Sequence, residues 1–125
     1  MIGQFAAVGI GAAIGAWLRW GLVVWLNPRV PAFPLGTLTS NLVGGFVAGI
    51  ALAVFLSRPE LAPEWRLFLI TGLLGGLTTF STFSLEVSEL LLAGDYATGT
   101  LLALAHLAGS VILTMVGFVT FRSLA

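Results

Sequence analysis

Four apolar runs, each long enough to cross a lipid bilayer, divide this sequence. A membrane-spanning helix needs about 20 mostly apolar residues, and prolines and charges bound runs at about residues 2–26, 33–56, 64–92 and 97–121. In a chain of 125 residues these runs leave room only for short loops. We therefore expect an all-α integral membrane protein whose four transmembrane helices form a single domain, residues 1–125.

Composition excludes several classes of protein. Charged residues make up only 8% of the chain, whereas soluble domains average about 25%. We expect no enzyme, because there is no space for a soluble catalytic domain and no serine–histidine–acid set or histidine pair at metal-ligand spacing. The zero net charge gives no indication of a nucleic-acid partner. We also expect no cleaved signal peptide, because the start lacks a positive charge and the first apolar run continues to Leu26.

Charges at the two ends of the predicted helices are nearly balanced. One end, which holds both termini, carries Arg58, Arg66 and Arg122. The other carries Arg29, together with Arg19 if that side chain reaches the interface. The positive-inside rule therefore gives little preference for one orientation. Two interpretations stay open: insertion in both orientations to form an antiparallel dual-topology homodimer, or a single orientation with the N-terminus inside.

Pairs of small residues four apart recur in every apolar run. Such pairs lie on one helix face and let another backbone approach closely. They predict tight helix packing and indicate no particular activity. The pairs are Gly11 and Gly15, Gly45 and Gly49, Gly72 and Gly76, and Ala105 and Gly109.

Two runs carry a polar helix face. In the second, Thr37 and Asn41 are four residues apart, and an unpaired amide at the depth of Asn41 costs several kcal/mol. Asn41 therefore either joins two helices or donates an N–H to a passing anion. In the fourth, His106, Ser110 and Thr114 follow at the same spacing. Three polar groups over about two turns favour a polar track, although His106 alone is more typical of an interhelical contact.

The third run predicts a broken helix. Gly75 and Gly76 weaken it, and the hydroxyl residues that follow compete for backbone hydrogen bonds, so we expect an unwound segment at about residues 75–79. Non-helical backbone at this depth must be buried in protein or face water, and its freed carbonyls suit a hard monovalent cation. Beyond the break, Phe80 and Phe83 are three apart, which puts both rings on one side of a resumed helix.

The candidate lining groups favour a small anion. Amide and hydroxyl donors and the positive edges of aromatic rings all attract negative charge. No arginine or lysine lies at midspan, so weak dipoles would hold the ion and permit its release. The carboxylates Glu86 and Glu89 lie toward the end of the third run, and none lies at midspan. Proton-coupled exporters need such a buried carboxylate.

These motifs resemble the Fluc fluoride channels, the CrcB proteins of bacteria, over the whole chain. The residues that carry the resemblance are GTL at 36–38 leading to Asn41, and GGLTTFSTFS at 75–84. The resemblance implies an antiparallel dual-topology homodimer with two pores in the bacterial cytoplasmic membrane, exporting fluoride passively. Hydrogen fluoride enters as a neutral acid and dissociates, and the channel releases the trapped anion. The alternative is a small dual-topology four-helix drug/proton exporter, which needs a carboxylate that residues 2–26 lack.

The resemblance also implies a role for individual residues. Backbone carbonyls of Gly75 and Thr78 would hold a structural sodium ion at the dimer interface, and Arg19 would lie at the aqueous vestibule. The implied partners are fluoride, a second copy of the chain and membrane lipid. The expected fluoride-pore residues are Thr37, Asn41, Phe80, Ser81, Thr82, Phe83, His106, Ser110 and Thr114.

Overall fold

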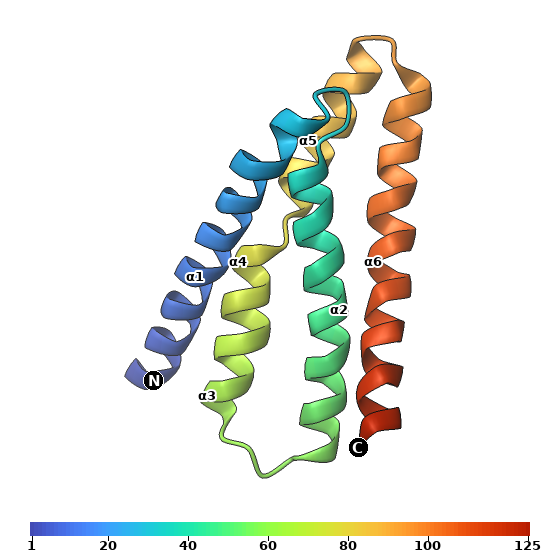
Figure 1. The fold of residues 1–125 in the computed structure, drawn as a ribbon. Helices are drawn as coiled ribbons and strands as arrows, with labels where there is room; N and C mark the ends of the chain where they lie inside the picture. Colours follow the sequence, from blue (N-terminus) through green and yellow to red (C-terminus); the bar gives the residue numbers. More distant parts are fainter.

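The computed structural model describes all 125 residues as an all-helical fold (Figure 1). Four helices are long and apolar enough to cross a membrane, as predicted. Three of them are α1 (Ile2–Leu26), which continues into the short η1 (Asn27–Arg29), α2 (Leu35–Ser57) and α6 (Tyr96–Leu124). The third span is divided into α3 (Pro63–Arg66), η2 (Leu67–Leu74), α4 (Gly75–Leu77) and α5 (Phe80–Leu92).

Local chemistry explains where the helices start. The side chain of Asn27 accepts the N–H of Gly36 at 2.7 Å and so satisfies a free amide in the first turn of α2. Asp95 caps α6 by accepting the N–H of Thr98 at 3.1 Å. Between α5 and α6, Gly94 adopts φ 82°, a left-handed conformation that glycine reaches without steric cost. These caps allow the short turns that four spans in a small chain require.

The third span changes its neighbours along its length. Its first half, through η2 and α4, packs against α1, and its second half, α5, packs against α6. Helices α2 and α6 pack together along their lengths and form the other side of the bundle (Figure 1). Both termini lie toward the same end as the connection between α2 and α3 (Figure 1). The third span therefore crosses from one helix to another within the bundle.

Small residues allow the close packing that their spacing predicts. A Cβ at Gly15 would overlap the backbone of Leu73, and one at Gly49 would overlap the backbone of Thr114. Gly76 in turn fits against the backbone of Ala12. These positions bring α1 against the third span and α2 against α6 at backbone distance.

The helix break is confirmed, but it is narrower than predicted. Gly75 has helical angles of φ −62° and ψ −36°, and the helix continues to Leu77. Only Thr78 (φ −89°, ψ 155°) and Thr79 (φ −152°, ψ 119°) are extended. Unwinding from Gly75 was therefore wrong for residues 75–77, because α1 packs against α4 and keeps it helical. The π-helical winding of η2 was not predicted.

Candidate functional site

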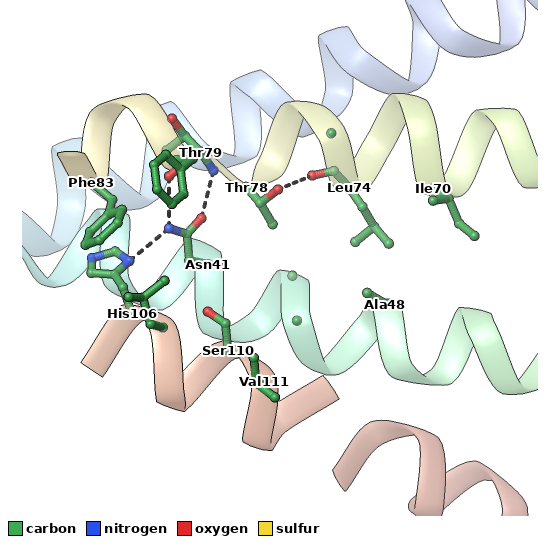
Figure 2. Close-up of a pocket in the computed structure, with 15 residues that line it drawn as sticks. Asn41, Ala48, Ile70, Leu74, Thr78, Thr79, Phe83, His106, Ser110 and Val111 are labelled. Carbon is green, nitrogen blue, oxygen red and sulfur yellow. Dashed lines mark hydrogen bonds between the residues drawn. The ribbon is translucent and has the colours of Figure 1, made fainter. Parts of the chain in front are cut away.

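A groove of about 430 Å³ opens beside the break. Helix α2 forms one wall, η2, α4 and α5 form another, and α6 completes it. Figure 2 shows polar groups gathered at one end of the groove and apolar side chains such as Ile70 and Ala48 at the other. No arginine, lysine or carboxylate lines it. The predicted residues that line the groove are Asn41, Gly75, Thr78, Phe80, Phe83, His106 and Ser110.

Asn41 binds the extended backbone of Thr79 in both directions. Its Oδ1 accepts the N–H of Thr79 at 2.7 Å, and its Nδ2 donates to the Thr79 carbonyl at 3.0 Å (Figure 2). The amide therefore pairs with the break as a neighbouring β-strand would. The structure shows that Asn41 joins α2 to the third span.

This pairing also fixes the tautomer of His106. Because the Thr79 N–H identifies the amide oxygen of Asn41, the atom 2.9 Å from His106 Nδ1 is the amide nitrogen, which only donates. Nδ1 must then accept, and the ring hydrogen is on Nε2. That Nε2 is buried and has no hydrogen-bond partner. The site therefore contains a neutral imidazole with a free N–H donor.

The two phenylalanines lie together but differ in exposure. Their ring centroids are 5.2 Å apart with an interplanar angle of 78°, an edge-to-face arrangement. Phe83 is 6% exposed and lies against the His106 ring, at 4.5 Å between centroids. Phe80 is 70% exposed. One ring therefore belongs to the interior of the chain and the other projects from it.

The predicted hydroxyl residues fall into two groups. At the start of α5, Thr79 Oγ1 contacts the hydroxyls of Ser81 at 3.3 Å and Thr82 at 3.1 Å, and it accepts the Thr82 N–H. On α6, Ser110 lines the groove, whereas Thr114 donates to the Ser110 carbonyl and lies outside the lining. Sequence reasoning missed Thr79 as a site residue, although a threonine just before a helix start is a typical N-cap.

Thr37 and Glu86 form a polar pair beside this cluster. Thr37 is fully buried, and its hydroxyl donates to Glu86 Oε1 at 2.6 Å. The second oxygen, Oε2, is buried with no partner. Sequence reasoning placed Glu86 near the helix end and missed this contact. Its position three residues after Phe83 was the available signal, because that spacing keeps both on neighbouring parts of one helix surface.

The break leaves backbone carbonyls without their helical donors. In a continuous helix, Gly75 and Thr78 would accept the N–H groups of Thr79 and Thr82. Those groups bond instead to the side chains of Asn41 and Thr79. The Gly76 carbonyl accepts Arg19 Nε at 3.0 Å, which places the predicted vestibule arginine against the break.

The donor set at the break fits a monovalent cation. Unpaired carbonyl oxygens are neutral, hard ligands. They suit a monovalent cation, because a single positive charge does not require anionic ligands. No cluster of three histidine, cysteine or acidic side chains exists to hold a transition metal. The carbonyls of Gly75 and Thr78 therefore have the ligand chemistry that a monovalent cation needs.

Together, four spans, a broken third helix and a polar groove at the break define a small multi-pass membrane protein. The family model described as "CrcB-like protein, Camphor Resistance (CrcB)" matches residues 6–118. The chain belongs to the CrcB family.

Several relatives are similar over nearly their whole length. A protein of Thiobacillus denitrificans named "Fluoride-specific ion channel FluC" is 61% identical, with 96% of this chain and 97% of the relative covered. A protein of the same name from Ralstonia pickettii is 59% identical, with 95% and 94% covered. Another from Pseudomonas putida is 51% identical, with 97% and 95% covered.

Proposed function

We propose that this chain is a fluoride-selective channel that exports fluoride passively across the bacterial cytoplasmic membrane. The observation that carries the proposal is its high identity, over nearly the full length, to relatives named for that activity. A passive route suits the need, because fluoride formed inside from hydrogen fluoride leaves down its own gradient. The groove chemistry is consistent with this role.

The groove offers an anion weak donors in place of full positive charges. The edges of Phe80 and Phe83 carry partial positive charge, and the His106 ring beside Phe83 holds a donor, Nε2–H, that has no partner and is enclosed in a single copy of the chain. With no arginine or lysine in the lining, the ion would be held loosely enough to leave. Ser110 adds a hydroxyl to the groove lining, and Ser81 and Thr82 follow Phe80 at the start of α5. The hydroxyls of Thr37 and Thr114, also expected along the pore, bond to Glu86 and to the Ser110 carbonyl outside the lining.

An antiparallel homodimer would complete the groove. Phe80 is 70% exposed at its mouth, so one copy leaves a major lining ring uncovered. The near balance of arginines at the two ends is compatible with insertion in both orientations. Two copies related by an axis in the membrane plane would form two equivalent pores, each bordered by lipid.

A structural sodium ion would bind at the centre of that dimer. The freed carbonyls of Gly75 and Thr78 would supply its ligands from each copy, and the ion would balance their dipoles. Arg19, held on the neighbouring Gly76 carbonyl, would lie at the aqueous vestibule and attract anions to the entrance.

Fluoride efflux from proteoliposomes tests the proposal. Vesicles loaded with potassium fluoride, with valinomycin to balance charge, should release fluoride to an ion-selective electrode much faster than matched vesicles release chloride. Equal rates for the two anions would contradict a fluoride-selective channel. The exporter alternative requires proton-coupled movement of an organic drug, so drug transport driven by an imposed pH difference, without fast fluoride efflux, would favour that class instead.

A further inference from the structure

Asn41 replaces a helix acceptor at the break. Continuing the helix from α4 into α5 would require the Thr79 N–H to bond to the Gly75 carbonyl. Asn41 Oδ1 takes that N–H at 2.7 Å, which leaves the Gly75 carbonyl free. The Asn41 amide on α2 therefore takes the place of one backbone hydrogen bond of the third span.

The amide nitrogen of Asn41 also prevents Thr79 from adopting a helical conformation. Nδ2 donates to the Thr79 carbonyl at 3.0 Å, so both polar groups of Thr79 are held in an extended conformation. A return to helix would break both contacts and would leave the 9%-exposed amide of Asn41 without partners. The extended conformation of Thr79 is thus over-determined by a residue 38 positions away.

We call the two hydrogen bonds between the Asn41 amide and Thr79 the clamp. His106, on α6, orients it. Its Nδ1 accepts the remaining Nδ2 hydrogen of Asn41 at 2.9 Å, and the ring is only 3% exposed. Oδ1 and both Nδ2 hydrogens of Asn41 are thus all engaged at the break. This leaves the amide with a structural task at the break.

We propose that Asn41, oriented by His106, is the positioning residue of the central cation site. By holding Thr79 extended, it keeps the carbonyls of Gly75 and Thr78 available as ligands. The inference rests on the cation site within the proposed function. It assigns to Asn41 a role in ion retention at the dimer centre, in addition to the pore role that the resemblance implies.

Sodium-dependent stability of the purified protein tests this assignment. The unfolding midpoint in detergent is titrated with sodium chloride, with N-methyl-D-glucamine chloride holding ionic strength constant. We expect a saturable rise for the wild type and, for Asn41→Ala, an apparent sodium affinity about 10- to 100-fold weaker, as for other residues that orient metal ligands. His106→Ala, which keeps both contacts to Thr79, should weaken the affinity less.

Two control variants separate the clamp from its surroundings. Ser40→Ala removes a buried hydroxyl next to Asn41 that bonds only within α2, so it should keep the wild-type sodium response. Leu85→Ile alters an exposed side chain of α5 outside the groove and should also keep it. If Asn41→Ala cannot be purified, Asn41→Leu takes its place, because it keeps a side chain of similar size but removes the acceptor for the Thr79 N–H and both donors.

Each outcome addresses a different statement. A wild-type sodium response in Asn41→Ala, or in Asn41→Leu if that variant is used, would overturn the clamp while leaving the cation site intact. No sodium response in the wild type would overturn the cation site and the clamp together, whatever the fluoride efflux. A weakened response confined to the Asn41 and His106 variants supports the proposal.

Discussion

His106 shows how a neighbouring residue sets the chemistry of a side chain. The two contacts between Asn41 and Thr79 fix the amide, the amide fixes the imidazole tautomer, and the tautomer leaves an N–H without a protein partner. Such a buried, unsatisfied donor is uncommon in folded proteins. It lies in the ring that packs against Phe83, enclosed by protein in a single copy of the chain.

Replacement of Phe80 tests the role of the exposed ring. Phe80→Ile removes the positive ring edge, and we expect fluoride efflux to fall by about tenfold, equivalent to about 1.4 kcal/mol. The measurement is efflux from proteoliposomes, with dimer content checked by size-exclusion chromatography. Leu85→Ile is the matched control, because Leu85 is on the same helix, is exposed and lies outside the groove. Normal efflux through Phe80→Ile would exclude the ring-edge role.

Loss of the Thr37 hydroxyl should destabilise the fold. Thr37→Val leaves the Glu86 carboxylate, one oxygen of which already lacks a partner, without its remaining hydrogen bond. We expect a loss of about 1–3 kcal/mol in the free energy of unfolding, measured by thermal or chemical denaturation in detergent. Thr37→Ser keeps the hydroxyl and should stay close to the wild type. Equal losses in both variants would assign the effect to packing.

Residue types in the site could be predicted from the sequence, but most of their partners could not. Asn41 and His106 could be recognised because a polar side chain within a membrane span is costly and usually has a partner or a function. Their contact joins residues 65 positions apart, and the contact of Asn41 with Thr79 spans 38. Spacing along one helix carries no information about such pairs, so the clamp became visible only in three dimensions.

The third span illustrates the same limit at the scale of elements. Four helices and a break in the third follow from hydropathy and from glycine and hydroxyl content, and both are confirmed. The position of the break was wrong by three residues because composition does not show that α1 packs against α4. Gly76 allows the close packing of α4 against α1, and Thr78 and Thr79 form the break.

Close packing of α2 and α6 can be tested at Gly49. A methyl group there would overlap the backbone of Thr114, so Gly49→Ala should lower the free energy of unfolding by about 1–3 kcal/mol. Gly21→Ala is the control, because nothing lies within 4 Å of a Cβ at that position. Chemical denaturation of both variants in detergent provides the comparison. A Gly49→Ala variant as stable as Gly21→Ala would mean that the two helices can separate at little cost.

The whole molecule presents nearly balanced ends to the two sides of the membrane. Both termini and the α2–α3 connection lie toward one end, so labelling one terminus reports the orientation of the chain (Figure 1). Arginines occur near both ends, so their distribution favours neither orientation strongly. Orientation is therefore a property to be measured in cells.

A single introduced cysteine can measure that orientation. The chain has no native cysteine, and Ser123 is exposed at the C-terminal end, so Ser123→Cys gives one reporter. We expect a membrane-impermeant thiol reagent to label about half of the chains in intact cells, as equal insertion in two orientations requires. The other half should react after permeabilisation. Labelling of all chains, or of none, before permeabilisation would contradict dual topology.

The exchange of neighbours along the third span has a consequence for biosynthesis. As the chain leaves the ribosome from its N-terminus, α1 and the first half of the third span can pack before α6 has been made. By contrast, α5 packs against the last helix to be translated, and Asn41 finds its third partner, His106, on that helix. The polar groove is thus the final part of the monomer to form, and a chain interrupted before α6 would lack one wall of the ion path.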